Sequence, residues 1–174
     1  MSAPDATEFA RIIDLRHLPA GTVQIDADAA ECRRLAGRFG LSAIERLVAN
    51  VTMIADGGKV AVAGRLVADV IQPCAISGED FAVTINEPVD LRFVPAHALA
   101  VDTDEVELTA DACDEIAYDG LTFDLGEALA QTLALAIDPF AEGPEADRAR
   151  AEHNLAGEAG NGAFAALDAL KFPT

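Results

Sequence analysis

The sequence predicts an α+β fold. We expect an antiparallel β-sheet that forms a meander and can curl toward a split barrel, together with two main helices and a flexible C-terminal segment. Three observations predict it. Apolar and polar residues alternate from residue 47 to 93, glycine-containing turns divide this stretch, and two other stretches carry apolar residues at helical spacing. With 174 residues, the chain can bury one core but is short for two independent domains. We therefore expect one domain over residues 1–140, followed over residues 141–174 by a flexible linker and a short apolar tail.

The N-terminal part is expected to form a strand and then a helix. Residues 9–15 alternate in one phase, which is typical of a strand. Asp28 and Glu31 have the spacing of a capping box, in which each side chain accepts a backbone N–H of the other residue. Four apolar residues then recur on one helical face, and Gly40 suits a helix C-terminus: Cys32, Leu35, Ala36 and Phe39. We expect a helix near residues 28–39.

The middle of the chain predicts the sheet. Residues 45–54 alternate apolar with polar, and Asp56-Gly57-Gly58-Lys59 can form a tight hairpin turn. The apolar phase then continues from Val60 through Cys74. After a second turn at residues 77–79, the alternation is strict from residue 81 to 93 and is broken on the inner face only by Glu87. One apolar and one polar face are typical of an antiparallel sheet covered on one side.

The C-terminal part predicts a hairpin, a helix and a tail. Ile116 and Tyr118 precede the turn Asp119-Gly120, and Leu121 and Phe123 follow it, so we expect a hairpin there, after a short strand at residues 106–108. A second capping-box spacing opens an apolar helix near residues 124–137. Residues 141–162 are mostly small or charged and are expected to form the linker. The tail carries apolar residues that can dock on the domain or on a partner: Phe164, Leu167 and Leu170.

The charge of the chain limits its partners. Twelve Lys and Arg against 30 Asp and Glu give a net charge of −18, which argues against a protein that coats nucleic acid or anionic membranes. From Phe93 to Asp147 there is no Lys or Arg. The sequence shows no membrane-spanning apolar run and no signal-peptide pattern at its start, so we expect a cytoplasmic protein that binds neither membrane nor DNA. The acidic half can attract a basic protein, although solubility alone also explains this charge.

Four arginines are the candidate contacts for RNA or for a partner. Arg33, Arg34 and Arg38 lie on the polar side of the first predicted helix, and Arg46 starts the next strand. Phosphate binding needs such cations, because each contact releases counterions from the nucleic acid. An ordinary solvated helix face explains the same arginines.

Cysteine and histidine spacing predicts no metal site and no cofactor. Cys32, Cys74 and Cys113 form no CxxC pair, and the three histidines form no ligand pair. Cys74 to Ser77 has CxxS spacing, which leaves a thiol-dependent enzyme or redox protein using Cys74 as an alternative function. A packed cysteine explains Cys74 more simply, because its strand phase places it on the buried face.

Several segments follow one another in a fixed order over nearly the whole chain: a capped helix, Gly64-Arg65-Leu66-Val67-Ala68-Asp69-Val70, Gln72-Pro73-Cys74-Ala75-Ile76-Ser77, Leu91-Arg92-Phe93-Val94-Pro95, Asp124-Leu125-Gly126-Glu127, and Phe164-Ala165-Ala166-Leu167-Asp168-Ala169-Leu170-Lys171. In this order the segments resemble the YceD family, the bacterial large ribosomal RNA subunit accumulation proteins. Two segments depart from the family pattern. The turn after Cys74 is acidic where family members often carry a second cysteine or a basic residue, and Asn161-Gly162-Ala163-Phe164 replaces the usual Asn-Pro-Phe.

The resemblance implies a role in the accumulation of large-subunit ribosomal RNA, and hence in ribosome assembly. It implies no known catalytic activity and supplies no ligand residues. We therefore expect a non-catalytic bacterial factor that acts mainly as a protein-interaction module. Its expected partner is a ribosomal or ribosome-assembly protein, and ribosomal RNA is a second possible partner through the arginines.

Overall fold

The computed structural model describes residues 8–99 and 115–153. Five strands form one sheet in the order β2-β3-β4-β5-β6, and β1 and β7 form a second, two-stranded sheet. The strands are β1 (Ile12–Asp14), β2 (Thr22–Asp26), β3 (Ala43–Asp56), β4 (Lys59–Pro73), β5 (Asp80–Pro95), β6 (Glu115–Tyr118) and β7 (Thr122–Asp124). The helices are the 3-10 turn η1 (Leu15–His17), α1 (Ala29–Phe39), α2 (Ala96–Leu99), α3 (Leu125–Ala136) and α4 (Ala146–Glu152).

The described residues divide into two compact units. The sheet unit contains the described residues up to 72 and from 82 to 138, and the small unit contains residues 73–81 and 139–153. The small unit consists of the turn that joins β4 to β5 and the segment with α4. The α4 helix forms within the stretch where the sequence predicted only a linker. The domain boundary at residue 140 stays a prediction.

The long strands of the sheet unit bury one face, as the alternation predicted. β3 pairs antiparallel with both β2 and β4, and β5 is the next neighbour of β4. The buried residues follow a period of two along all three long strands: Leu47, Ala49, Val51 and Met53 in β3, Val60, Val62, Leu66, Ala68 and Val70 in β4, and Ile85, Val89 and Phe93 in β5. The predicted α+β class is confirmed, and both sheets are open rather than closed into a barrel.

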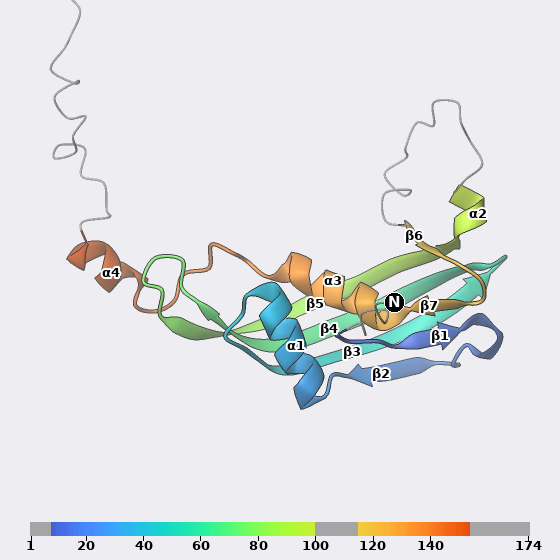
Figure 1. Ribbon diagram of the computed structural model, residues 1–174, viewed down its shortest axis with the longest axis horizontal. Helices are drawn as coiled ribbons and strands as arrows, with labels where there is room; N and C mark the ends of the chain where they lie inside the picture. Colours follow the sequence, from blue (N-terminus) through green and yellow to red (C-terminus); the bar gives the residue numbers. More distant parts are fainter. Residues whose placement is uncertain (1–7, 100–114, 154–174) are drawn as a thin grey trace, which may run out of the picture. The chain divides into compact units, whose positions relative to one another are not determined.

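The helices α1 and α3 cover the apolar face of the five-stranded sheet (Figure 1). Both predicted helices are confirmed within one residue at each end. The α1 capping box is complete, because Asp28 accepts the N–H groups of Ala30 and Glu31 while Glu31 accepts the N–H of Asp28. Gly40 closes α1 in the left-handed conformation with a φ of 68°.

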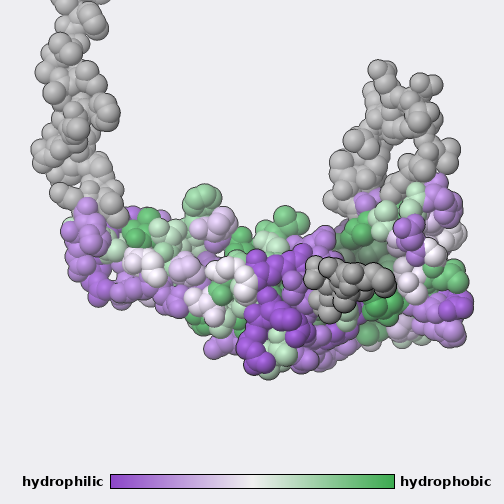
Figure 2. All heavy atoms as spheres, viewed as in Figure 1, coloured by the Kyte–Doolittle hydropathy of each residue, from purple (hydrophilic) through white to green (hydrophobic). Residues whose placement is uncertain are grey.

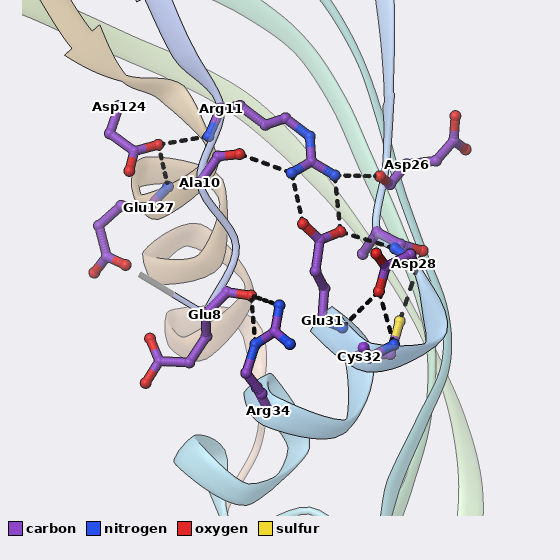
Figure 3. Close-up of polar contacts among 12 residues, drawn as sticks. Glu8, Ala10, Arg11, Asp26, Asp28, Glu31, Cys32, Arg34, Asp124 and Glu127 are labelled. Carbon is purple, nitrogen blue, oxygen red and sulfur yellow. Dashed lines mark hydrogen bonds and ion pairs between the residues drawn. The ribbon is translucent and has the colours of Figure 1, made fainter. Parts of the chain in front are cut away.

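The ion pair between Arg11 and Glu31 joins the N-terminal segment to α1 (Figure 3). Arg11 donates hydrogen bonds of 2.7 and 2.8 Å to the two carboxylate oxygens of Glu31, and a third to the Asp26 carbonyl. The Glu31 side chain is only 12% exposed, and the Arg11 guanidinium lowers its pKa to about 2. The backbone N–H of Arg11 donates to Asp124, the residue that caps α3. The same short segment therefore connects the N-termini of both helices.

The predicted hairpin around Asp119-Gly120 is wrong. Gly120 does turn the chain with a positive φ, but β6 pairs in parallel with β5, and β7 pairs with β1 in the other sheet. Tyr118 of β6 donates a hydrogen bond to the Gly58 carbonyl, whereas Phe123 of β7 stacks on Phe93. A turn motif specifies a chain reversal but not the partners of the strands beside it, and tertiary contacts decide those partners.

Two further predictions differ from the structure, and two lie outside the described residues. The predicted single sheet is two sheets, and the strand expected over residues 9–15 is the shorter β1 followed by η1. The strand expected at residues 106–108 and the apolar tail lie outside the described residues.

We predict that Gly64→Ala destabilises the sheet by about 1–3 kcal/mol. A Cβ at Gly64 would lie 2.0 Å from the Asn50 carbonyl oxygen, so β3 and β4 would have to separate. Gly37→Ala in α1 is the matched control, because a Cβ there meets no atom within 4 Å and alanine favours a helix by about 0.5–1 kcal/mol over glycine. Urea unfolding measures both free energies. Equal free energies of unfolding for the two variants would contradict the prediction.

Candidate functional site

Two of the candidate arginines on α1 are held by oxygen atoms of the sheet unit. Arg34 donates hydrogen bonds of 3.3 and 3.1 Å to the backbone carbonyl of Glu8 (Figure 3). Arg38 donates two hydrogen bonds of 2.8 and 2.7 Å to the Glu127 carboxylate, and a third to the carboxylate of Glu8. The bidentate contact raises the pKa of Arg38 and lowers that of Glu127. These two arginines join α1 to the N-terminal segment and to α3.

The other two candidate arginines do not extend this pair into one cluster. Arg46 lies on β3 and forms an ion pair of 2.8 Å with Asp69, its register partner on β4. Arg33 is exposed and has no hydrogen bond or ion pair within residues 8–99 and 115–153. Hydrophilic side chains do gather over α1 (Figure 2), but acidic and carbonyl oxygens accompany three of the four arginines. The four residues therefore do not form a continuous basic patch.

A groove of about 380 Å³ lies in the sheet unit beside α3, and we call it the α3 groove. Its walls come from β5, β6 and α3. The apolar residues that line it include Leu91, Ile116, Leu135 and Ala136, and Leu135 is 89% exposed. Hydrophobic surface is visible over part of α3 in Figure 2. A smaller groove of about 250 Å³ continues along α3 toward Phe123 and shares Ile116 with the first. The two grooves also share Ala128 and Gln131 of α3, so both lie beside this helix.

The charged residues that line the α3 groove are all acidic. They are Glu87, Asp90 and Glu115. Glu115 forms an ion pair of 3.3 Å with Lys59, whereas the side chains of Glu87 and Asp90 have no hydrogen bond or ion pair with any residue that the structure describes. Glu87 lies on the inward phase of β5 and is half-buried, between the buried Ile85 and Val89. A half-buried carboxylate beside apolar walls is an electrostatically favourable site for a cation.

The sequence analysis did not identify this groove, although it contained one signal of it. Glu87 interrupts an otherwise strict apolar alternation, and an acidic residue on the inner face of a strand needs a polar neighbour or an opening to solvent. The other walls come from β6 and α3, which lie more than 20 residues further along the chain. Their position beside β5 could not be inferred from local patterns.

The small unit places Cys74 in a turn that stabilises its thiolate. The backbone N–H groups of Ile76 and Ser77 both donate to the Cys74 sulfur at 3.4 Å. Hydrogen bonding by the Ser77 side chain, together with these N–H groups and that of Gly143, lowers the Cys74 pKa to about 7. Cys74 is 4% exposed, so the predicted burial is confirmed. In contrast, burial raises the pKa of Cys32 on α1, and Cys113 lies outside the described residues.

The described residues contain no group of three histidine, cysteine or acidic side chains arranged to hold a metal ion. They also contain no buried side-chain nitrogen or oxygen without a hydrogen-bond partner, so no such atom there points to a missing ligand. In the same ranges, no helix has the length and apolar character needed to cross a membrane.

Comparison with known proteins identifies one family. The model of the family described as "Large ribosomal RNA subunit accumulation protein YceD" matches residues 62–171, which is more than half of the chain. No curated protein and no solved structure matches the chain. The matched region contains β5, the walls of the α3 groove and the Cys74 turn. The chain belongs to the YceD family.

Proposed function

We propose that the protein is a non-catalytic cytoplasmic factor in the accumulation of large-subunit ribosomal RNA, and that it acts in ribosome assembly mainly through protein contacts. The family description supports the link to large-subunit ribosomal RNA. The pairing of the candidate arginines supports the preference for protein contacts. Arg38 and Arg46 already bind carboxylates, and a protein with a net charge of −18 repels the phosphates of an RNA helix.

The acidic surface then selects basic partners. Ribosomal proteins that bind RNA must themselves carry basic surfaces, since phosphate binding requires cations. Opposite charges on two proteins accelerate their encounter and disfavour wrong partners. Direct RNA binding, where it occurs, is limited to a small contribution from exposed cations such as Arg33.

We predict that ribosomal proteins remain bound to the tagged full-length chain after ribonuclease treatment of a cell lysate. The physical reason is that contacts to basic proteins do not depend on RNA, whereas an RNA-mediated association disappears with it. Mass spectrometry of the bound material, with and without ribonuclease, measures the difference. An Arg33→Gln chain serves as a matched variant and should recover the same proteins. Loss of all ribosomal material on ribonuclease treatment would contradict the proposed mode of action.

Cys74 favours a second candidate function, a thiol-dependent activity. Its pKa of about 7 makes a large fraction of the thiol ionised at neutral pH, and the thiolate is the reactive form of cysteine. Burial limits its access to large reagents. The low pKa has a structural cause in the turn, so it does not by itself require a catalytic role.

We predict that the rate of Cys74 alkylation by iodoacetamide rises with pH through a midpoint near 7, and that Ser77→Ala moves this midpoint upward. Hydrogen bonds donated to sulfur favour the charged thiolate and lower the pKa, so the loss of the hydroxyl raises it. Peptide-resolved mass spectrometry separates the cysteines, and Cys32 is the internal control with a raised pKa. A midpoint near the ordinary value of 9.0, unchanged in Ser77→Ala, would exclude the stabilised thiolate.

A further inference from the structure

We propose that the α3 groove binds a basic amphipathic segment of a partner protein, with apolar side chains in the groove and a lysine or arginine on Glu87. The inference rests on the proposed function and names the chemistry of the partner and the place where it docks. Three observations carry it: the shape and apolar walls of the groove, the acidic residues that line it, and the position of Glu87.

The apolar part of the groove fits side chains rather than an ion alone. Leu91 and Ile116 are half-buried in its walls, and Leu135 at its edge is 89% exposed. Burial of apolar surface contributes about 25 cal/mol per Å², so a segment that covers these residues gains affinity from them. The volume of about 380 Å³ lies within the range of known binding pockets. The groove therefore accepts the apolar side of an amphipathic segment.

Glu87 selects the charge of that segment. Glu87 is half-buried on the inward phase of β5, and its carboxylate has no cationic partner among the described residues. Desolvation by a bound neutral group would destabilise this carboxylate, whereas a lysine or arginine would pair with it. The groove would therefore bind a segment with a lysine or arginine beside its apolar side chains more tightly than a segment with a neutral residue at that position.

The acidic residues around Glu87 disfavour RNA and a second copy of this chain as occupants. Asp90 and Glu115 add negative charge to the groove lining, and no lysine or arginine lines the groove. Two cations lie near the lining within the described part of the chain: Lys59, through its ion pair with Glu115, and Arg92, the register partner of Glu115 on β5. RNA phosphates and a second copy of this acidic chain would both be repelled. Charge complementarity thus favours a basic protein segment.

The test uses the full-length chain and a fluorescent probe peptide. The probe is a helix-forming peptide of leucine and lysine, with leucines on one face, and the comparison peptide has the same composition in scrambled order. Fluorescence anisotropy measures the affinity of both peptides. We expect the amphipathic probe to bind about tenfold more tightly than the scrambled one, and its affinity to fall as salt is added.

Two double variants separate the groove from general electrostatic attraction. Glu87→Gln with Asp90→Asn removes two negative charges from the groove, and Glu45→Gln with Asp56→Asn removes two from exposed positions that do not line it. We expect the groove variant to bind the probe about tenfold more weakly and the control variant to bind it like the unchanged chain. Thermal unfolding followed by circular dichroism confirms that both variants fold.

Four outcomes would overturn the proposal. The two double variants could weaken binding equally, or the two peptides could bind equally well. A labelled single-stranded RNA oligonucleotide could bind the chain and lose this binding in the groove variant, or the chain could form a dimer that the groove variant dissociates. The proposed function has a separate readout: a groove variant that still recovers ribosomal proteins from lysate overturns the groove alone. A chain that binds the probe through the groove but recovers no ribosomal material overturns the proposed function alone.

Discussion

The apolar face shared by β3, β4 and β5 is the constraint on which the rest of the sheet unit depends. Because side chains alternate along a strand, a shift of one residue in any of these strands would expose its whole apolar set. The two helices are placed by this face, since α1 and α3 must cover it. Glu87 is the acidic residue within that apolar phase on β5, and it lines a groove beside α3.

The ion pairs of the sheet unit join the same elements that pack on this apolar face. Arg11 and Arg38 join the N-terminal segment, α1 and α3 through Glu31 and Glu127, so the cations of the first helix region serve the fold. The residues outside these ion pairs carry a net negative charge, because the chain has more than twice as many acidic as basic residues. A surface of net negative charge, on which Arg11, Arg38 and Arg46 are already paired, is suited to basic partners, and this is the physical link between the fold and the proposed role.

The sequence predicted those parts of the structure that local patterns determine. Strict alternation predicted the long strands, and the capping residues Asp28 and Asp124 predicted where the helices begin. The short strands β6 and β7 were paired wrongly, because strands of four and three residues take their partners from distant packing. The partner of Arg38 was also hidden, since Glu127 lies 89 residues away in the chain. The inward phase of Glu87 was visible in the sequence, but the groove walls were not.

Carbodiimide crosslinking tests the central claim most directly, because this reagent joins carboxylates to lysines only where the two are in contact. The full-length chain is incubated with assembling large ribosomal subunits, crosslinked, digested and analysed by mass spectrometry. The account predicts crosslinks from Glu87 or Asp90 to lysines of a ribosomal or assembly protein. An absence of such protein crosslinks, combined with ultraviolet crosslinks from Arg33 and its neighbours to ribosomal RNA, would contradict it.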